Sequence, residues 1–393
     1  MKETKFKDTE LGKIPEEWDY GKFEDYLDKF SAGATPYRGI ASNFIGTIPW
    51  VSSGELNYNY ITDTREHISQ DAQKSTHLTL HPKGTFLIAI TGLEAAGTRG
   101  RCAFIETPAT TNQSCLAIYS TEKMIVEYLF WFYQQWSDYL AFNFSQGSKQ
   151  QSFTAEIVKK LPIYAPSLSE QQRIASALSD ADALVAELDA LIEKKRAIMA
   201  GTMQELLTGK RRLQGFSEPW VERTIEDFAK ITTGASNTQD QAPFGIFPFY
   251  IRSASVMKSN RFLYDCEGVI TIGDGQIGKV FHYVNGKFDL HQRCYLIYDF
   301  YDVDAKFFYY IFSAFFYERA IALSAKATVD SVRRDMIAKM KVDLPSLAEQ
   351  RAIASILSDM DAEIAELEAK RDKYKEVRQG MMQQLLTGKI RLI

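Results

Sequence analysis

Two polar loops in the first half of the chain carry side chains that could contact nucleic acid. Residues 97–101 read Gly-Thr-Arg-Gly-Arg and place Arg99 and Arg101 on a flexible backbone. Arginine bonded twice to guanine is the commonest specific base contact. Residues 146–152 add Lys149, which suits a phosphate, and Gln150 and Gln151, whose amides suit adenine. The candidates in the second half are Arg252, Lys258, Arg261, Lys279, Arg333 and Arg334. Taken singly, each of these residues is more often solvated surface than a DNA contact, so the prediction concerns the loops as a set.

Signatures of a catalytic centre are missing from the sequence. It contains no N-P-P-[FY] or D-P-P-Y tetrapeptide of an amino-methyltransferase and no GxxxxGK[ST] loop of an ATP-driven motor. Residues 273–278 read Gly-Asp-Gly-Gln-Ile-Gly, but a β-like run follows them where a dinucleotide-binding loop requires a helix, so we interpret them as a turn. The four cysteines and five histidines show no spacing typical of a metal site. We therefore expect a binding protein without catalytic residues, metal or cofactor of its own.

The composition is that of a globular cytoplasmic protein with more than one domain. The chain has 393 residues, of which 45% are hydrophobic and 24% charged. Its first ten residues are polar, and no apolar run is long enough to span a membrane. The net charge of −4 argues against a protein that binds DNA alone and non-specifically, because such proteins usually carry a basic excess.

An internal repeat organises the chain. The sequence Pro-Ser-Leu-Ser-Glu-Gln at residue 166 returns as Pro-Ser-Leu-Ala-Glu-Gln at residue 345, and Leu-Thr-Gly-Lys at residue 207 returns at residue 386. Residues 166–213 align with residues 345–392 without a gap, and 28 of the 48 aligned pairs are identical. The ranges before each copy, 1–160 and 214–340, are far less similar to each other. The chain therefore alternates variable and constant segments.

The constant segments predict two long helices. Ser167 with Glu170, and Ser346 with Glu349, match the S-x-x-E capping box, in which the serine accepts from one backbone amide and the glutamate reaches back to another. Glycines after Leu-Leu-Thr are plausible helix stops, which gives a first helix over about 168–206. Apolar residues follow a heptad pattern. They are Ile174, Leu178, Ala181, Val185, Leu188 and Ile192 in the first copy, and Ile353, Leu357, Met360, Ile364 and Leu367 in the second.

The heptad seam requires a partner surface. Lys195 and Arg371 fall at apolar-seam positions, which argues against a long extended homodimer. A duplication within one chain favours antiparallel pairing of the two copies, because each helix then meets the other reversed. The alternative is that each helix packs only onto its neighbouring globular domain.

The two variable ranges share a coarse pattern of short strands followed by an aromatic helix. Residues 85–90 and 101–105, and in the second range 268–272 and 279–283, are typical of strands. Residues 124–141 and 303–321 are typical of helices rich in Phe, Tyr and Trp. These rings could stack on bases, but aromatic residues at helical spacing are more often core, and we favour that interpretation.

The order of motifs resembles the DNA-specificity subunit of type I restriction–modification systems over essentially the whole chain. The resemblance is carried by residues 11–18, 31–36, 48–50, 111–113 and 146–148, and above all by the duplicated Pro-Ser-Leu-x-Glu-Gln helix with its downstream Leu-Thr-Gly-Lys. It implies an α+β chain made of two α/β target-recognition domains, at 1–160 and 214–340. Two long conserved helices, at 161–213 and 341–393, would separate them as an antiparallel intramolecular coiled coil with pseudo-twofold symmetry.

The resemblance also implies a role and partners. Each domain would read one half of a bipartite, gapped double-stranded DNA site, and the helices would fix the gap. Two methyltransferase subunits would bring S-adenosylmethionine and flip an adenine out of the duplex. Motor-nuclease subunits would use ATP and Mg²⁺ to cleave unmethylated DNA. Phosphate neutralisation by these partners would account for the acidic net charge of this chain.

Two alternatives remain open at this level. One is a non-productive scaffold or decoy that binds methyltransferase subunits through its coiled coil without reading DNA. The other is a self-sufficient DNA-modifying enzyme of an unrecognised type.

Overall fold

The computed structural model describes residues 4–95, 97–147, 149–324 and 331–393, so that Ser148 of the predicted contact loop lies outside the described residues. Contacts divide the chain into two compact units. Unit 1 comprises Met1–Glu187 and Arg371–Ile393, and unit 2 comprises Leu188–Lys370. The division cuts both long helices, because part of each helix packs with each unit.

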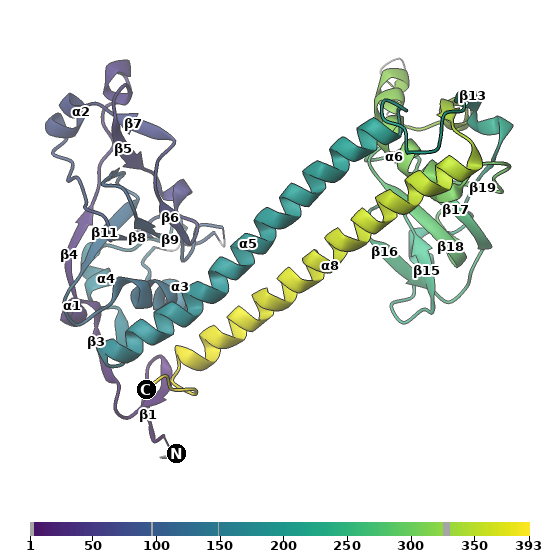
Figure 1. Cartoon of the computed structure of the whole chain (residues 1–393). Helices are drawn as coiled ribbons and strands as arrows, with labels where there is room; N and C mark the ends of the chain where they lie inside the picture. Colours follow the sequence, from purple (N-terminus) through teal and green to yellow (C-terminus); the bar gives the residue numbers. More distant parts are fainter. Residues whose placement is uncertain (1–3, 96, 148, 325–330) are drawn as a thin grey trace. The chain divides into compact units, whose positions relative to one another are not determined.

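Unit 1 is built on a five-stranded sheet (Figure 1). In spatial order its strands are β4 (Leu27–Ala32), β11 (Cys115–Ser120), β8 (Phe86–Ala89), β9 (Cys102–Ile105) and β6 (Asn59–Ile61). Neighbouring strands are antiparallel except β6 and β9, which are parallel. Phe86 and Ile88 join the hydrophobic cluster formed with helix α3 (Val126–Phe144), whereas Leu87 and Ala89 join a second cluster. The sheet is therefore buried on both faces, as the two-residue period of a strand allows.

An accessory module adds its own small core to unit 1. Its sheet contains β10 (Thr110–Thr111), β5 (Ile48–Val51) and β7 (Glu66–Ile68), followed by helix α2 (Gln70–Ser75). Trp50, Ile68, Ala72 and Leu78 pack together within the module. Val51 instead joins the cluster with Leu87 and Ala89 of the main sheet, so the module covers that sheet's second face.

Two 3-10 turns, Ala41–Phe44 and Ser53–Glu55, flank β5, and the first of them contacts β7 and α2. The remaining elements of unit 1 are β1 (Phe6–Thr9), β2 (Gly12–Pro15), β3 (Asp19–Lys22), α1 (Phe23–Tyr26), α4 (Ala155–Lys159) and β12 (Pro162–Ala165). Strand β12 pairs antiparallel with β3 and leads directly into the long helix.

Unit 2 repeats this plan with a six-stranded sheet. Its spatial order is β14 (Lys230–Thr233), β19 (Cys294–Tyr298), β17 (Tyr264–Ile272), β18 (Phe281–Leu290), β15 (Phe247–Tyr250) and β16 (Val256–Ser259). Helix α6 (Ala305–Ser324) packs on β17 and β18. Strands β13 (Val221–Thr224) and β20 (Lys341–Leu344) form a separate two-stranded sheet, and the 3-10 turn Ile225–Asp227 that follows β13 contacts helix α7 (Arg334–Ala338). A second 3-10 turn, Thr238–Asp240, follows β14.

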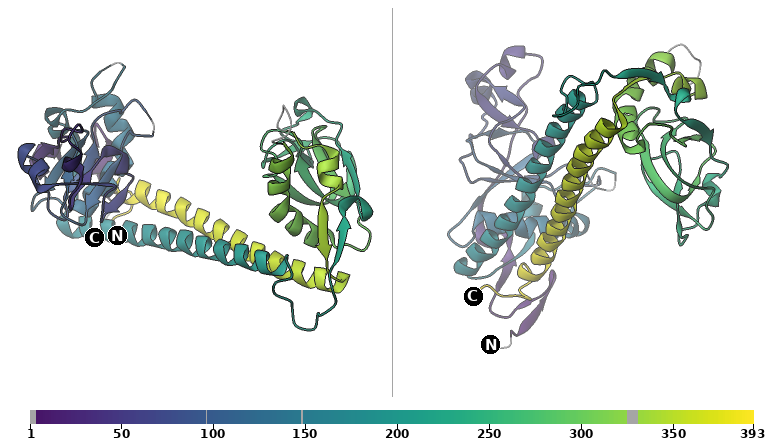
Figure 2. Two further views of the ribbon diagram at one scale, coloured as in Figure 1. Left: turned by 90° about the horizontal axis from the view of Figure 1, so that it is seen from above. Right: turned by 45° about the vertical axis from the view of Figure 1, so that its right-hand side comes forward.

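Two helices of 39 residues each, α5 (Leu168–Leu206) and α8 (Leu347–Leu385), pack together in antiparallel orientation (Figures 1 and 2). Within unit 1, Arg378 of α8 forms an ion pair with Asp182 of α5. Within unit 2, Lys195 of α5 lies 2.6 Å from Glu363 of α8. The predicted intramolecular pairing is thus confirmed, and Lys195 satisfies its charge at the seam through a cross-helix ion pair.

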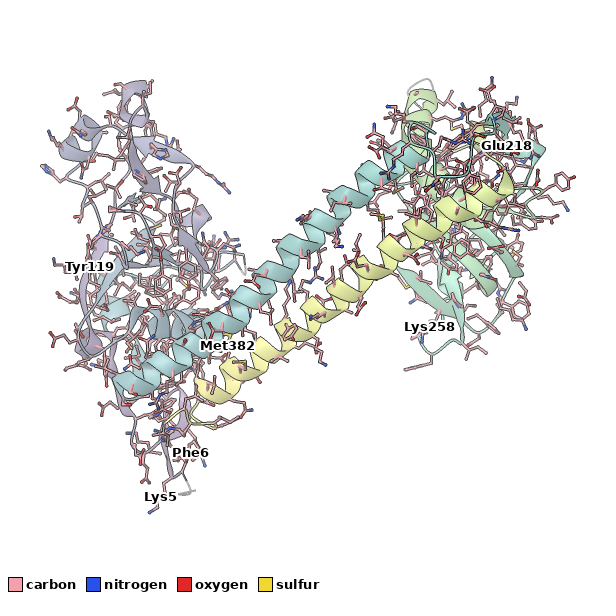
Figure 3. All side chains as sticks on the ribbon, viewed as in Figure 1. Lys5, Phe6, Tyr119, Glu218, Lys258 and Met382 are labelled. Carbon is pink, nitrogen blue, oxygen red and sulfur yellow. The ribbon has the colours of Figure 1, made fainter. Side chains whose placement is uncertain are left out.

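The heptad residues are shared between helix pairing and the cores of the units. Met382 of α8, labelled in Figure 3, lies in one cluster with Ile174 of α5 and Trp131 of α3. The predicted pairing residues Ile174, Leu178, Val185, Leu188, Ile192, Ile353, Leu357 and Ile364 are buried, and Leu367 is partly buried. Each helix therefore packs both on its partner helix and on the neighbouring domain. The two alternatives raised by the sequence, helix pairing and packing on a domain, are both present.

The predicted elements of the variable ranges are present with shifted ends. The run at 268–272 is the end of β17, which begins earlier, at Tyr264, and the run predicted from 279 is β18, which begins at Phe281. Residues 273–278 form the turn between these strands, as predicted, with a positive φ of 83° at Gly275. The aromatic rings of α3 are mostly buried, which confirms their role as core. Among the described residues, no helix combines the length and hydropathy of a membrane span.

Candidate nucleic-acid interface

Each long helix begins at a joint of matched side chains. In unit 1, Arg391 donates two hydrogen bonds of 2.7 and 2.8 Å to the buried carboxylate of Glu170. In unit 2, Arg212 donates two bonds of 2.7 Å to the buried carboxylate of Glu349. These bidentate pairs raise the pKa of both arginines above the ordinary value. We name these two sites the helix-start joints.

The helix-start joints correct one prediction about the caps. Ser167 Oγ accepts from the backbone amide of Glu170 at 3.3 Å, as the capping box predicts. The Glu170 carboxylate does not reach back to the cap but binds Arg391 and accepts from Trp18 Nε1 at 3.1 Å. An arginine fork binds a carboxylate more strongly than a neutral amide does, which accounts for the exchange. Ser346 precedes the first residue of α8, as Ser167 does in α5.

The glutamine of the repeated motif is also part of each joint. Gln171 accepts from the amide of Ile125 at 2.8 Å, just before α3. Gln350 accepts from the amide of Asp304 at 2.9 Å, just before α6. The motif Pro-Ser-Leu-x-Glu-Gln therefore ties each long helix to the aromatic helix of its own unit.

A set of backbone hydrogen bonds holds three loops together at one end of the unit 1 sheet. The amide of Ile90, directly after β8, donates to the carbonyl of Ser114, directly before β11, at 2.9 Å. The amide of Phe153 donates to the carbonyl of Ile90 at 2.9 Å. Thr91 and Ser152 form an antiparallel bridge beside these bonds. We call this arrangement the loop frame.

Unit 2 contains the same loop frame. The amide of Gly273, directly after β17, donates to the carbonyl of Arg293, directly before β19, at 2.8 Å. The amide of Val332 donates to the carbonyl of Gly273 at 2.8 Å, and Asp274 bridges to Ser331. The position of Ser114 in unit 1 is therefore equivalent to that of Arg293 in unit 2, and Thr91 is equivalent to Asp274.

A fourth loop closes each frame through a glutamine. Gln113 Oε1 accepts from Thr35 Oγ1 at 2.5 Å in unit 1, and Gln292 Nε2 donates to Asn237 Oδ1 at 2.5 Å in unit 2. In unit 1 this contact links the loop after β4 to the residue before Ser114. In unit 2 it links the loop after β14 to the residue before Arg293. The glutamine is the same in both units, and its partner differs.

A glycine makes the close approach of that fourth loop possible. A Cβ on Gly33 would lie 1.9 Å from the carbonyl oxygen of Thr111, and a Cβ on Gly234 would lie 1.9 Å from that of Leu290. Neither position can hold a side chain without movement of the backbone.

Two predicted contact residues, Arg101 and Lys279, occupy equivalent positions. Each follows a glycine with positive φ, 74° at Gly100 and 64° at Gly278, which packs against the aromatic helix of its unit. Lys279 is exposed, with its Nζ 5.3 Å from the centre of the Tyr317 ring. Arg101 is half-buried at the edge of a polar cleft.

That cleft in unit 1 has a volume of about 680 Å³. Its walls are strand β6 with the segments on either side of it, between residues 54 and 65, and Arg101 just before β9. Its lining residues are Gly54, Glu55, Asn57, Asn59, Tyr60, Ile61, Thr62, Asp63, Thr64, Arg65 and Arg101. The mixture of amides, hydroxyls and charges of both signs suits hydrogen bonding to base edges better than binding of an apolar ligand.

Other predicted contact residues differ in how free their side chains are. Arg99 donates to the carbonyls of Leu93 and Glu94 at 2.7 and 2.9 Å, so it braces its own loop. Lys149 and Gln150 are exposed. The backbone N–H of Gln151 donates to Glu94 Oε2 at 2.8 Å.

Arg261 in unit 2 is likewise committed to its own fold. Its guanidinium contacts Ser236 at 3.0 Å, Asp240 at 3.2 Å and the buried Asp289 at 3.5 Å. Lys258 lies on edge strand β16 and is exposed (Figure 3), and Arg333 and Arg334 are exposed at the start of α7.

Arg252 belongs to a cluster that the sequence did not indicate. Asp274 Oδ2 lies 2.6 Å from Arg293 Nη1 and 3.2 Å from Arg252 Nη1. Burial alone would raise the pKa of Asp274, but the bonds and charges of the two arginines outweigh it and lower the pKa. Arg293 was missed because its position relative to Asp274 depends on the register of β17 and β19. The repeated Gln-x-Cys of residues 113–115 and 292–294 was the available signal.

The comparisons with known proteins agree with this architecture. Residues 15–195 and 217–376 match the family described as type I restriction modification DNA specificity domain. The chain is 36% identical over 188 residues to the type I restriction enzyme MjaIX specificity subunit of Methanocaldococcus jannaschii, covering 47% of this chain and 42% of that relative. It is 25% identical to a putative type I restriction enzyme MjaX specificity subunit of the same organism, covering 100% of this chain and 98% of that relative.

Solved structures show the same fold. The S subunit of a type I restriction–modification system from M. genitalium superposes with a TM-score of 0.67 at 14% identity, over 94% of this chain and 96% of that one. A chain from a structure describing complex assembly and conformational transition of the type I R-M system gives a TM-score of 0.57 at 15% identity, over 96% and 99% of the two chains. The chain therefore belongs to the type I restriction–modification DNA specificity subunits, the non-catalytic component of these enzymes.

Proposed function

We propose that this chain selects a bipartite, gapped double-stranded DNA sequence and presents it to the other subunits of a type I restriction–modification complex. Unit 1 reads one half-site and unit 2 the other, and the α5–α8 pair sets their separation. The observation that carries the proposal is the loop frame. It occurs once in each unit with the same backbone bonds, but presents different side chains, such as Ser114 and Arg293. One protein thus carries two readers with different chemistry.

The partners follow from the same proposal. Two modification subunits bring S-adenosylmethionine, and restriction subunits bring ATP and Mg²⁺, so the chemistry lies outside this chain. Among the described residues, no group of three or more His, Cys, Asp or Glu side chains is placed to hold a metal ion. A net charge of −4 fits a chain that contributes base contacts while its partners neutralise many of the phosphates.

Co-expression with a type I modification subunit, followed by mapping of methylated adenines, tests the proposal. We expect one bipartite motif with a constant gap. Methylation by this chain alone would identify it as a self-sufficient enzyme. A contiguous motif would contradict the two-reader arrangement, and a complex that forms without any methylation would indicate a decoy.

A further inference from the structure

The equivalent positions before β11 and β19 hold side chains that differ in length, charge and number of hydrogen-bond donors. Ser114 carries one short hydroxyl, whereas Arg293 carries a long guanidinium with five N–H donors. The carbonyls of both residues accept the same frame bond, at 2.9 and 2.8 Å. The two backbones are therefore held alike, and the difference between the units at this point is a difference of side chain.

Asp274 holds the guanidinium of Arg293 in a defined orientation. The ion pair uses Nη1 of Arg293 at 2.6 Å, and the side chain of Asp274 is only 21% exposed. Among the described residues, Nε and Nη2 of Arg293 have no hydrogen-bond partner, and 61% of its side chain is exposed. These two atoms form one edge of the guanidinium fork, and that edge remains available to a ligand.

The residues around Arg293 favour a base over a phosphate as that ligand. A hollow of about 370 Å³ is lined by Thr233, Gly273, Asp274, Gln292, Arg293, Tyr295, Ser331 and Val332. Asp274 keeps its negative charge, because the bonds and charges of Arg293 and Arg252 outweigh its burial and lower its pKa. It therefore neutralises one of the two arginine charges, and the site attracts a phosphate less strongly than two unpaired arginines would. A guanine edge instead offers two neutral acceptors, O6 and N7, at the spacing of an arginine fork.

We propose that Arg293, positioned by Asp274, reads a guanine in the half-site of unit 2, and that unit 1 makes no equivalent contact because Ser114 and Thr91 stand at these positions. The inference rests on the function proposed above. Asp274 is a positioning residue, since it acts through Arg293 and not on the base.

The test substitutes Arg293 by the residue that unit 1 carries. Arg293→Ser is co-expressed with the modification subunit, and the methylated sites are mapped and compared with those of the unchanged chain. We expect discrimination at a single G·C position of one half-site to fall about 5- to 150-fold, the range of one lost bidentate base contact. The other half-site and the gap should be unchanged, which also shows that the variant folds and assembles.

Two further variants separate base reading from charge. Arg293→Lys keeps the charge without the fork, so it should relax the same position as Arg293→Ser. Arg252→Ser removes an arginine from the same carboxylate but not from the lining of the hollow, so it should lower methylation without relaxing that position.

Each contrary outcome has a defined meaning. Full guanine discrimination in Arg293→Ser, or equal relaxation in Arg252→Ser, would overturn the assignment to Arg293 while leaving the bipartite motif intact. Full discrimination in Arg293→Lys alone would show that the charge, and not the planar fork, reads the base. Absence of any bipartite motif from the unchanged chain would instead overturn the proposed function. Asp274→Asn should relax the same position while phosphate binding, measured as the salt dependence of DNA affinity, stays the same or increases. Unaltered discrimination would remove Asp274 from the proposal.

Discussion

The helix-start joints repeat their side chains, whereas the loop frames repeat only their backbone bonds. Glu170 with Arg391 and Glu349 with Arg212 are matched in residue type, bond number and distance. The loop frames match in three backbone contacts but present Ser114 in one unit and Arg293 in the other. This contrast separates two tasks. The joints fix where each long helix begins, and the frames fix where variable side chains are presented.

Lengthening both long helices tests whether the constant parts alone set the gap. Insertion of one heptad into the middle of α5 and of α8 adds on the order of 10 Å to each helix. We expect the gap of the methylated motif to grow by roughly three base pairs, at 3.4 Å per step. Both half-sites should stay the same, and methylation at the original sites should be lost. Altered half-sites would show that the helices also contribute to base reading.

Removing a carboxylate from a joint should cause the largest loss of stability. Glu349→Ala leaves Arg212 without its buried partner and should cost about 3–5 kcal/mol of unfolding free energy. Glu170→Ala should cost about 1 kcal/mol more, because Trp18 Nε1 also loses its acceptor. Trp220, the corresponding tryptophan in unit 2, has a buried Nε1 without a hydrogen-bond partner among the described residues.

Urea unfolding measures both losses, and Glu363→Ala is the matched control. Glu363 also pairs with a basic residue across the helices, but its side chain is 50% exposed, so its loss should cost about 1 kcal/mol or less. Equal losses for the buried and exposed glutamates would show that the joints carry no special stability.

The glycine of the fourth loop offers a smaller, local perturbation. Gly33→Ala and Gly234→Ala should each cost about 1–3 kcal/mol, because the added methyl group overlaps a carbonyl oxygen of the same unit. Gly97→Ala is the control, since a Cβ there meets no atom within 4 Å. Thermal unfolding of the three variants ranks them. A destabilised control with unaffected Gly33 and Gly234 variants would contradict the close approach.

The smallest expected effect concerns the equivalent basic residues Arg101 and Lys279. If each contacts a phosphate, replacement by alanine should weaken DNA binding uniformly across sequences and reduce the salt dependence by about 0.9 per contact. Titration of the assembled complex with cognate and non-cognate DNA at several salt concentrations measures both quantities. Relaxed specificity in Arg101→Ala would instead assign Arg101 to base reading within the cleft of unit 1.

The sequence predicts the repeated parts of the fold well, because local signals are enough for them. A capping serine, a heptad pattern and a glycine stop locate α5 at 168–206, where the structure has it. The role of Glu170 could not be predicted in the same way. Its partner Arg391 is 221 residues away along the chain, and a local capping box is the only signal that a single sequence offers.

The candidate interface is less predictable for a physical reason. Arg99 and Arg261 look as suitable as any arginine in a polar loop, but their guanidiniums are used within their own units. Whether a guanidinium is free depends on carbonyls and carboxylates that only the fold brings near. Arg293 is the converse case: the repeated Gln-x-Cys aligns it with Ser114 in the sequence, but its ion pair with Asp274 depends on the pairing of β17 with β19.

Backbone hydrogen bonds carry no information about side-chain identity, and this has a consequence for how new specificities arise. The bonds at Ser114 and Arg293 use only amide and carbonyl groups, so almost any residue can be exchanged there without loss of the frame. The frame thus makes the protein evolvable, because substitutions at the reading positions can change the DNA sequence that is recognised while the scaffold stays folded. A combinatorial library confined to positions 91, 114, 274 and 293 should therefore yield many folded proteins with altered DNA targets.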